Sequence, residues 1–146
     1  MTTEPTRPGP PAMSPTILVI TLSRRVEAAL AAALAPLDLT VARLGLLGHI
    51  NGVPGASFSE LARMSGTSVQ SVHTAVKALA GAGLVEDRTA RAGSASAIEL
   101  TEAGTRLLAE ARKAVTRTDT ELFGPDADPI QRRVGQAIVA AFTGAS

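Results

Sequence analysis

Apolar positions recur along this chain at helical spacing, and prolines and glycines divide the chain into segments. In residues 16–35 the apolar side chains lie near one helical face, and Pro36 ends the segment. We therefore predict a long first helix that Ser14 caps and Pro15 opens. A second helix is expected over residues 38–49, before a turn rich in glycine and proline.

The middle of the chain has the signals of a helix-turn-helix. Ser57 and Glu60 fit a capping box, in which each side chain accepts a hydrogen bond from the other residue's amide, and a short helix should follow. Gly66 makes a turn, and Thr67 or Ser68 caps a helix that runs to residue 80. The apolar residues of that helix recur three or four positions apart: Val69, Val72, Val76 and Leu79.

The rest of the chain predicts a hairpin and two helices. Residues 84–85 and 97–101 have strand-like patterns on either side of a tip rich in glycine, alanine and serine. Thr101 should cap a helix that ends near residue 118, and a last helix is expected over residues 128–142. This order is that of a winged helix-turn-helix. We predict a mainly α fold with a two-stranded β wing and long N- and C-terminal helices, preceded by a disordered arm at residues 1–14.

Composition limits the chemistry that the chain can perform. It has 146 residues, a formal net charge of +1, no cysteine and two histidines. Disulfides, thiolate metal sites and cysteine nucleophiles are therefore excluded. His49 and His73 have no carboxylate cluster beside them, so no metal or cofactor is expected. Ser71 and His73 point about 200° apart on a helix, so we expect no catalytic pair and no enzyme activity.

The N-terminal region and the apolar runs bear on location. The proline-rich N-terminus has the wrong composition for a signal peptide. No apolar run approaches the roughly 20 residues of a membrane span. We therefore expect a cytoplasmic protein without a membrane partner.

A set of residues from the short helix to the start of the next long helix stands at a characteristic spacing: Leu61-Ala62, Gly66, Ser68, Val72, Val76, Leu79, Gly83-Leu84-Val85, Leu100-Thr101-Glu102 and Gly104. In this order and spacing the chain resembles the MarR family of bacterial winged-helix regulators. The resemblance implies one domain over residues 15–146, with a DNA-binding lobe near 57–101. It also implies a homodimer through helices near 16–35 and 102–143, which intertwine with those of the partner subunit.

The same resemblance implies how such a dimer binds its ligands. The helix over residues 68–80 would enter the DNA major groove, and the hairpin tip would enter the flanking minor groove. A ligand pocket would lie between the dimer helices and the DNA-binding lobe. The wing departs from this pattern, because Asp87, Gly93 and Ala95 stand where the family commonly has Arg, Asp and Arg. Residues 57–101 also hold four basic and four acidic residues, whereas DNA-binding lobes are normally basic.

These patterns predict two groups of binding residues. DNA contacts are expected from Ser68, Gln70, Ser71, His73, Thr74, Lys77, Arg88 and Arg91. A small aromatic or anionic effector is expected at Arg25, Arg43 and His49. The alternatives are a merely solvated helix face, arginines paired with Glu27, Asp38 or a partner subunit, and a histidine at the rim of the core.

Two functional hypotheses follow. The first is a ligand-responsive transcription factor that binds a palindromic operator as a homodimer, with the effector changing the spacing of the two recognition helices. The second is a winged-helix protein that has lost DNA binding and uses its pocket to bind a small molecule or as an enzyme. The polar recognition helix favours the first hypothesis, and the altered wing favours the second.

Overall fold

The computed structural model describes residues 14–88 and 97–144. In chain order its elements are α1 (Pro15–Leu34), the 3-10 helix η1 (Ala35–Leu37), α2 (Val41–Gly52), α3 (Phe58–Ser65), α4 (Val69–Gly81), β1 (Val85–Asp87), β2 (Ile98–Leu100), α5 (Glu102–Phe123) and α6 (Pro129–Thr143). This order confirms the predicted mainly α winged helix-turn-helix. Of the predicted arm, residues 1–13 lie outside the described residues.

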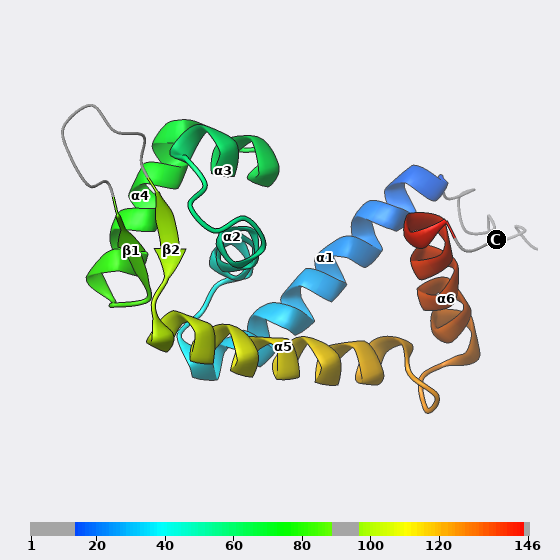
Figure 1. The fold of residues 1–146 in the computed structure, drawn as a ribbon. Coiled ribbons are helices and arrows are strands. Elements are labelled where there is room, and N and C mark those ends of the chain that lie inside the picture. Colours follow the sequence, from blue (N-terminus) through cyan, green and yellow to red (C-terminus); the bar gives the residue numbers. More distant parts are fainter. Residues whose placement is uncertain (1–13, 89–96, 145–146) are drawn as a thin grey trace, which may run out of the picture.

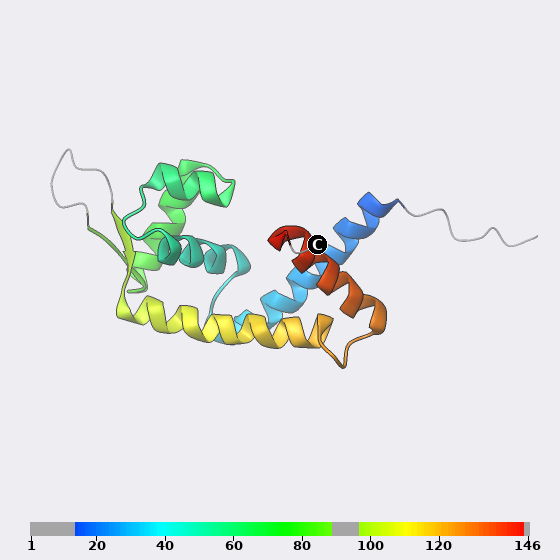
Figure 2. The ribbon, with the colours of Figure 1, turned by 45° about the vertical axis from the view of Figure 1, so that its right-hand side comes forward.

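The winged-helix elements gather at one end of the molecule. α2, α3, α4 and the antiparallel pair β1–β2 form this lobe, and α5 runs from the lobe to the opposite end (Figure 1). α1 packs against α5, and α6 folds back at the far end on the same side of α5 as α1 (Figure 2). The fold therefore separates a winged-helix lobe from a pair of terminal helices.

The hydrophobic core lies within the lobe and along the first half of α5. Its fully buried larger side chains come from α1, α2, α3, α4 and β2: Leu34, Leu47, Ile50, Leu61, Val72, Leu79 and Ile98. Leu108, Ala111 and Ala114 continue this core along α5. No residue of α6 is buried, so the last helix adds nothing to the core of the single chain.

Three hydroxyl caps begin helices where the sequence predicts them. The side-chain oxygens of Ser57, Ser68 and Thr101 each accept the amide of the residue three positions on, all at 3.1 Å. Ser68, and not Thr67, is the cap of α4. The capping box is incomplete, because no bond returns from the Ser57 amide to the Glu60 carboxylate among the described residues. One hydroxyl at each helix start is enough to set its position.

The start of α2 differs from the prediction. Asp38 has a φ of 53° in the left-handed region and ends η1, so the chain cannot be helical from residue 38. Thr40 caps α2 instead, accepting the Arg43 amide at 3.2 Å, and the helix runs on to Gly52. The left-handed residue thus moves the start of α2 three positions along the chain.

Two other predictions also need correction. Ser14 precedes α1 but its side chain makes no capping bond, and Pro15 still occupies the first turn. α5 does not end near residue 118, because Thr118 is buried and no helix breaker occurs before Gly124. The longer α5 carries the chain to the far end of the molecule, where α6 begins.

The N-terminus of α5 is in close contact with the wing. The Thr101 amide donates to the Leu84 carbonyl at 3.0 Å, and the Thr101 hydroxyl donates to the Gly83 carbonyl at 2.6 Å. Gly104 is buried there, and a Cβ at this position would overlap the Leu84 carbonyl oxygen and lie 3.0 Å from its carbonyl carbon. The glycine is therefore what lets the helix and the wing approach so closely.

Candidate nucleic-acid interface and pocket

The exposed face of α4 carries the polar residues that the sequence assigns to DNA. Val72, Val76 and Leu79 are buried beneath it. The outward-facing residues are Gln70, Ser71, His73, Thr74 and Lys77, all exposed. α4 is thus anchored through one face and open to solvent along the other, which is the arrangement that a groove-binding helix needs.

Part of this polar face borders a shallow hollow of about 670 Å³. Gln70, His73 and Lys77 line it from α4, Phe58 lines it from α3 and Asp87 from β1. The His73 ring stacks on the Phe58 ring, with centroids 3.8 Å apart and planes 15° apart. Phe58 is not among the residues predicted from the sequence, although an aromatic at the first position of a short helix, in a chain with three phenylalanines, is a usable signal.

Ser71 and His73 lie in different environments. Ser71 faces the N-cap, where its hydroxyl lies 2.9 Å from the Ser68 hydroxyl, and it lines a different pocket from His73. His73 is occupied by its stack on Phe58. Within residues 14–88 and 97–144, no group of three or more histidine, cysteine, aspartate or glutamate residues could hold a metal ion.

The base of the wing holds its arginine between two carboxylates. Glu86 and Glu99 face each other across the strand pair, a repulsive arrangement for like charges. The Arg88 Nε lies 3.3 Å from the Glu86 carboxylate and 3.2 Å from that of Glu99. Arg88 therefore bridges the two strands with the same group that would reach DNA. Arg91 lies outside the described residues, as do Gly93 and Ala95.

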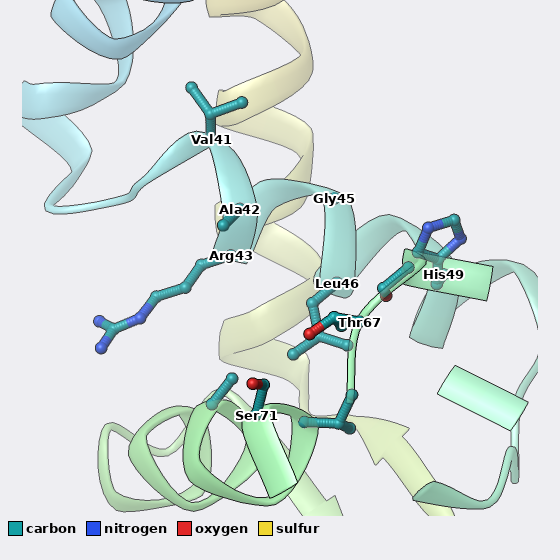
Figure 3. Close-up of a pocket in the computed structure, with 11 residues that line it drawn as sticks. Val41, Ala42, Arg43, Gly45, Leu46, His49, Thr67 and Ser71 are labelled. Atoms are coloured by element: carbon teal, nitrogen blue, oxygen red, sulfur yellow. The ribbon is translucent and has the colours of Figure 1, made fainter. Parts of the chain in front are cut away.

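A second pocket, of about 360 Å³, lies between α2 and α4 (Figure 3). Arg43 and His49 line it from α2, Thr67 from the turn before α4, and Ser71 from α4 itself. The remaining lining is largely apolar, from Val41, Ala42, Gly45, Leu46, Val72 and Ala75. Arg43 and His49 stand at opposite sides of the pocket in Figure 3. Arg25 is exposed on α1 and does not line it.

The arginines proposed for an effector are not held by intrachain ion pairs. In the described part of the chain, neither Arg25 nor Arg43 forms a salt bridge, so the expected pairing with Glu27 or Asp38 is wrong for the single chain. An arginine at a pocket rim without an acidic partner is available to an anion.

The terminal helices expose apolar side chains. On α1 these are Ile17, Leu18, Val19 and Ile20, and on α6 they are Ile130, Ile138, Val139 and Phe142. Phe142 is the most exposed of them, at 88%. Among the described residues no single helix is long and apolar enough to cross a membrane, and only the pair 15–37 and 41–52, bent by 76°, meets that length and composition.

Comparison with known proteins agrees with this geometry. Residues 37–94 match the sequence model of the MarR family, which confirms the resemblance seen in the sequence. The structure of the Mycobacterium tuberculosis MarR family protein Rv2887 is similar at 28% identity and a TM-score of 0.71, covering 88% of this chain and 94% of that one. No curated protein sequence matches the chain.

Two complexes of the same mycobacterial protein are also similar. Its complex with DNA has 25% identity and a TM-score of 0.73, and covers 88% of this chain and 98% of that one. Its complex with p-aminosalicylic acid has 26% identity and a TM-score of 0.69, with the same coverage. This similar protein has therefore been solved both with DNA and with an aromatic acid.

Proposed function

Because residues 37–94 match the MarR family and the fold is that of MarR family structures, we propose that this chain is a DNA-binding transcriptional regulator that responds to a small ligand. The observation that carries the proposal is the exposed polar face of α4 above a buried apolar face. It is supported by the similar mycobacterial protein solved in complex with DNA.

α4 would lie in the major groove, and each exposed residue has a role there. Gln70, near the helix N-terminus, can make a bidentate pair with adenine, while Ser68, Ser71 and Thr74 are permissive partners of bases or phosphates. Lys77 most simply reaches a phosphate. Arg88 and Arg91 would contact the flanking minor groove from the wing.

The pocket between α2 and α4 would hold the effector. Its apolar lining suits an aromatic ring, and Arg43 and His49 can bind a carboxylate or a phenol at its rim. A small aromatic acid is the ligand class that fits, and the p-aminosalicylic acid complex of the mycobacterial protein supports it. Since Ser71 and Val72 also line this pocket, a bound ligand would contact the reading helix directly.

We infer that the protein acts as a homodimer on a palindromic operator. The exposed apolar residues of α1 and α6 form a surface that water would solvate poorly, and a second copy would cover it. Two copies then present two α4 helices, so the operator would have two half-sites about one helical turn apart.

A second candidate function has an observation in its favour. The described wing holds three acidic residues and a single arginine that is already engaged by two of them. A protein that has given up DNA binding and kept its pocket as a small-molecule binder would tolerate such a wing. The two candidates differ in whether the chain binds DNA sequence-specifically.

The decisive experiment is a fluorescence anisotropy titration against DNA from upstream of its own gene, at low and moderate salt. A regulator binds one duplex more tightly than scrambled DNA of equal length. Lys77→Ala should then weaken binding to all sequences and flatten the salt slope, while Gln70→Ala should relax discrimination at one base position. Each change should cost about 1–3 kcal/mol. Equal binding to specific and scrambled DNA, with and without aromatic acids, would instead support a small-molecule binder that has given up DNA binding.

A further inference from the structure

We propose that Phe58 is a positioning residue for DNA binding, which holds the His73 ring so that the protonated ring contacts a DNA phosphate. This inference rests on the proposed DNA-binding function, and it adds a role for Phe58 and a dependence of DNA binding on pH. The observation behind it is the ring stack between α3 and α4, at the edge of the exposed polar face of α4.

The stack restricts a side chain that would otherwise be free. His73 is exposed, and an exposed histidine samples several rotamers. Phe58 is half-buried, packs against the core, and offers one face to the imidazole at a centroid distance of 3.8 Å. The planes are only 15° apart, so the phenyl ring covers a face of the imidazole and leaves its edge, where the ring nitrogens are, uncovered by the stack. The His73 side chain also lines the hollow. Part of the entropy of ordering His73 is therefore already lost before DNA binds.

Charge makes this contact matter more here than on a basic lobe. α4 contains a single lysine, Lys77, and no acidic residue. A protonated His73 would double the positive charge of the helix, one turn from Lys77 on the same face. Histidine is the side chain whose charge ordinarily changes between pH 5 and 8. A cation stacked on a phenyl ring is also favoured by the charge distribution of that ring.

Charged residues of both signs surround the hollow. Lys77 of α4 and Asp87 of β1 line the hollow together with His73. From α3, only Phe58 lines it, and the charged residues of that helix, Glu60 and Arg63, do not. A DNA phosphate at this face would accept a charge-assisted hydrogen bond from the protonated ring.

The test is the pH and salt dependence of DNA binding, measured by anisotropy with the full chain. Between about pH 8 and pH 6 the dissociation constant of the parent protein should tighten about tenfold, the scale of one charge-assisted hydrogen bond. The slope of log K against log salt should steepen by about 0.9, the value for one phosphate neutralised. His73→Gln should lose both effects. Glu110→Gln, a charge change on α5 away from the hollow, should keep both.

Variants of Phe58 separate positioning from charge. Phe58→Leu keeps an apolar side chain but not the ring face, and should lose most of the pH dependence while His73 is still present. Phe58→Tyr keeps the aromatic ring and should retain the pH dependence of DNA binding. Because the chain has two histidines, proton NMR of the free protein can follow both rings. The His73 ring protons should show an upfield ring-current shift that disappears in Phe58→Leu, which also reports whether that variant is folded.

The outcomes distinguish this proposal from the proposed function. If the parent protein binds its operator and His73→Gln or a folded Phe58→Leu keeps the full pH dependence, the positioning role is overturned and DNA binding stands. If Glu110→Gln abolishes the pH dependence as well, the effect is not specific to the stacked histidine and the role of His73 is again overturned. If no duplex binds at any pH, both proposals fall together.

Discussion

Replacing Glu99 with glutamine should strengthen DNA binding. Glu99→Gln keeps the shape of the side chain and removes one of the two carboxylates that hold the Arg88 Nε, the one at 3.2 Å. It also removes one of the three acidic residues in the described wing. The substitution therefore frees a cation and lowers repulsion at the edge that would face the DNA backbone.

The magnitude follows from the exposure of the pair. The Arg88 and Glu99 side chains are 65% and 37% exposed, so their ion pair contributes only about 0.2–1 kcal/mol. An arginine contact with a phosphate, as a charge-assisted bond, contributes about 1.5–3 kcal/mol. The phosphate contact therefore exceeds the ion pair, and binding gains at most the pair energy that no longer has to be broken, about 1 kcal/mol, or a roughly fivefold tighter dissociation constant. Stability should change by less than about 0.5 kcal/mol, as for most surface substitutions.

The assay is anisotropy with operator DNA at salt concentrations from about 50 to 200 mM, where phosphate contacts are read from the slope. The parent, Glu99→Gln and Glu110→Gln are compared. Glu110 is a matched control, because it also loses one charge from an ion pair, with Lys113 at 2.9 Å, but lies on α5. The slope should steepen by up to about 0.9 for Glu99→Gln and stay unchanged for Glu110→Gln.

Two results would refute this reasoning. Equal gains from Glu99→Gln and Glu110→Gln would mean that only net charge matters and that Arg88 is not released toward DNA. An unchanged slope with Glu99→Gln would mean that the wing does not contact phosphates. Combining Glu99→Gln with Arg88→Ala separates the two contributions, since only the long-range repulsion remains to be relieved.

Three further predictions concern stability, assembly and the pocket. Gly104→Ala should lower the free energy of unfolding, measured in urea, by about 1–3 kcal/mol, because its Cβ would overlap the wing backbone. The control Gly48→Ala, on a helix with open space around it, should raise this free energy by about 0.5–1 kcal/mol. Equal effects of the two substitutions would contradict the close contact. Phe142→Ser should shift sedimentation toward monomer, since this 88% exposed ring would be covered by a second copy, and an unchanged distribution would place the dimer contact elsewhere. Arg43→Gln should weaken salicylate binding, measured by calorimetry, about tenfold or more, because a charge-assisted hydrogen bond is lost. Arg25→Gln is the control, because Arg25 lies outside the pocket. Equal losses of affinity would argue against this pocket as the ligand site.

Local chemistry explains why the sequence predicts most of the fold. Hydroxyl residues at Ser57, Ser68 and Thr101 satisfy the first amides of three helices, and each works through neighbours three positions away. Where a boundary depends on backbone conformation or on distant packing, prediction failed. Asp38 adopts a left-handed conformation that its type does not require, and Thr118 is buried by tertiary contacts that no local pattern reveals.

The candidate site was predictable in its membership but not in its interactions. The residues placed on the exposed face of α4 follow from helical periodicity alone. The stack of His73 on Phe58 joins residues 15 positions apart in two helices, and the Arg88 bridge depends on the register of Glu86 opposite Glu99. Such contacts arise from how elements pack, so a pattern read along one chain does not contain them.

The length of α5 gives the molecule a mechanical property. This helix has 22 residues and therefore spans about 33 Å. One end is tied to the wing through Gly104, and the other carries α6 and its exposed apolar side chains. A rigid lever of this length that pivots by about 5° moves its far end by about 3 Å, close to the rise of one base pair. In the proposed dimer, a rotation of a few degrees where the two copies meet would thus shift the DNA-binding lobe by about one base step along the operator.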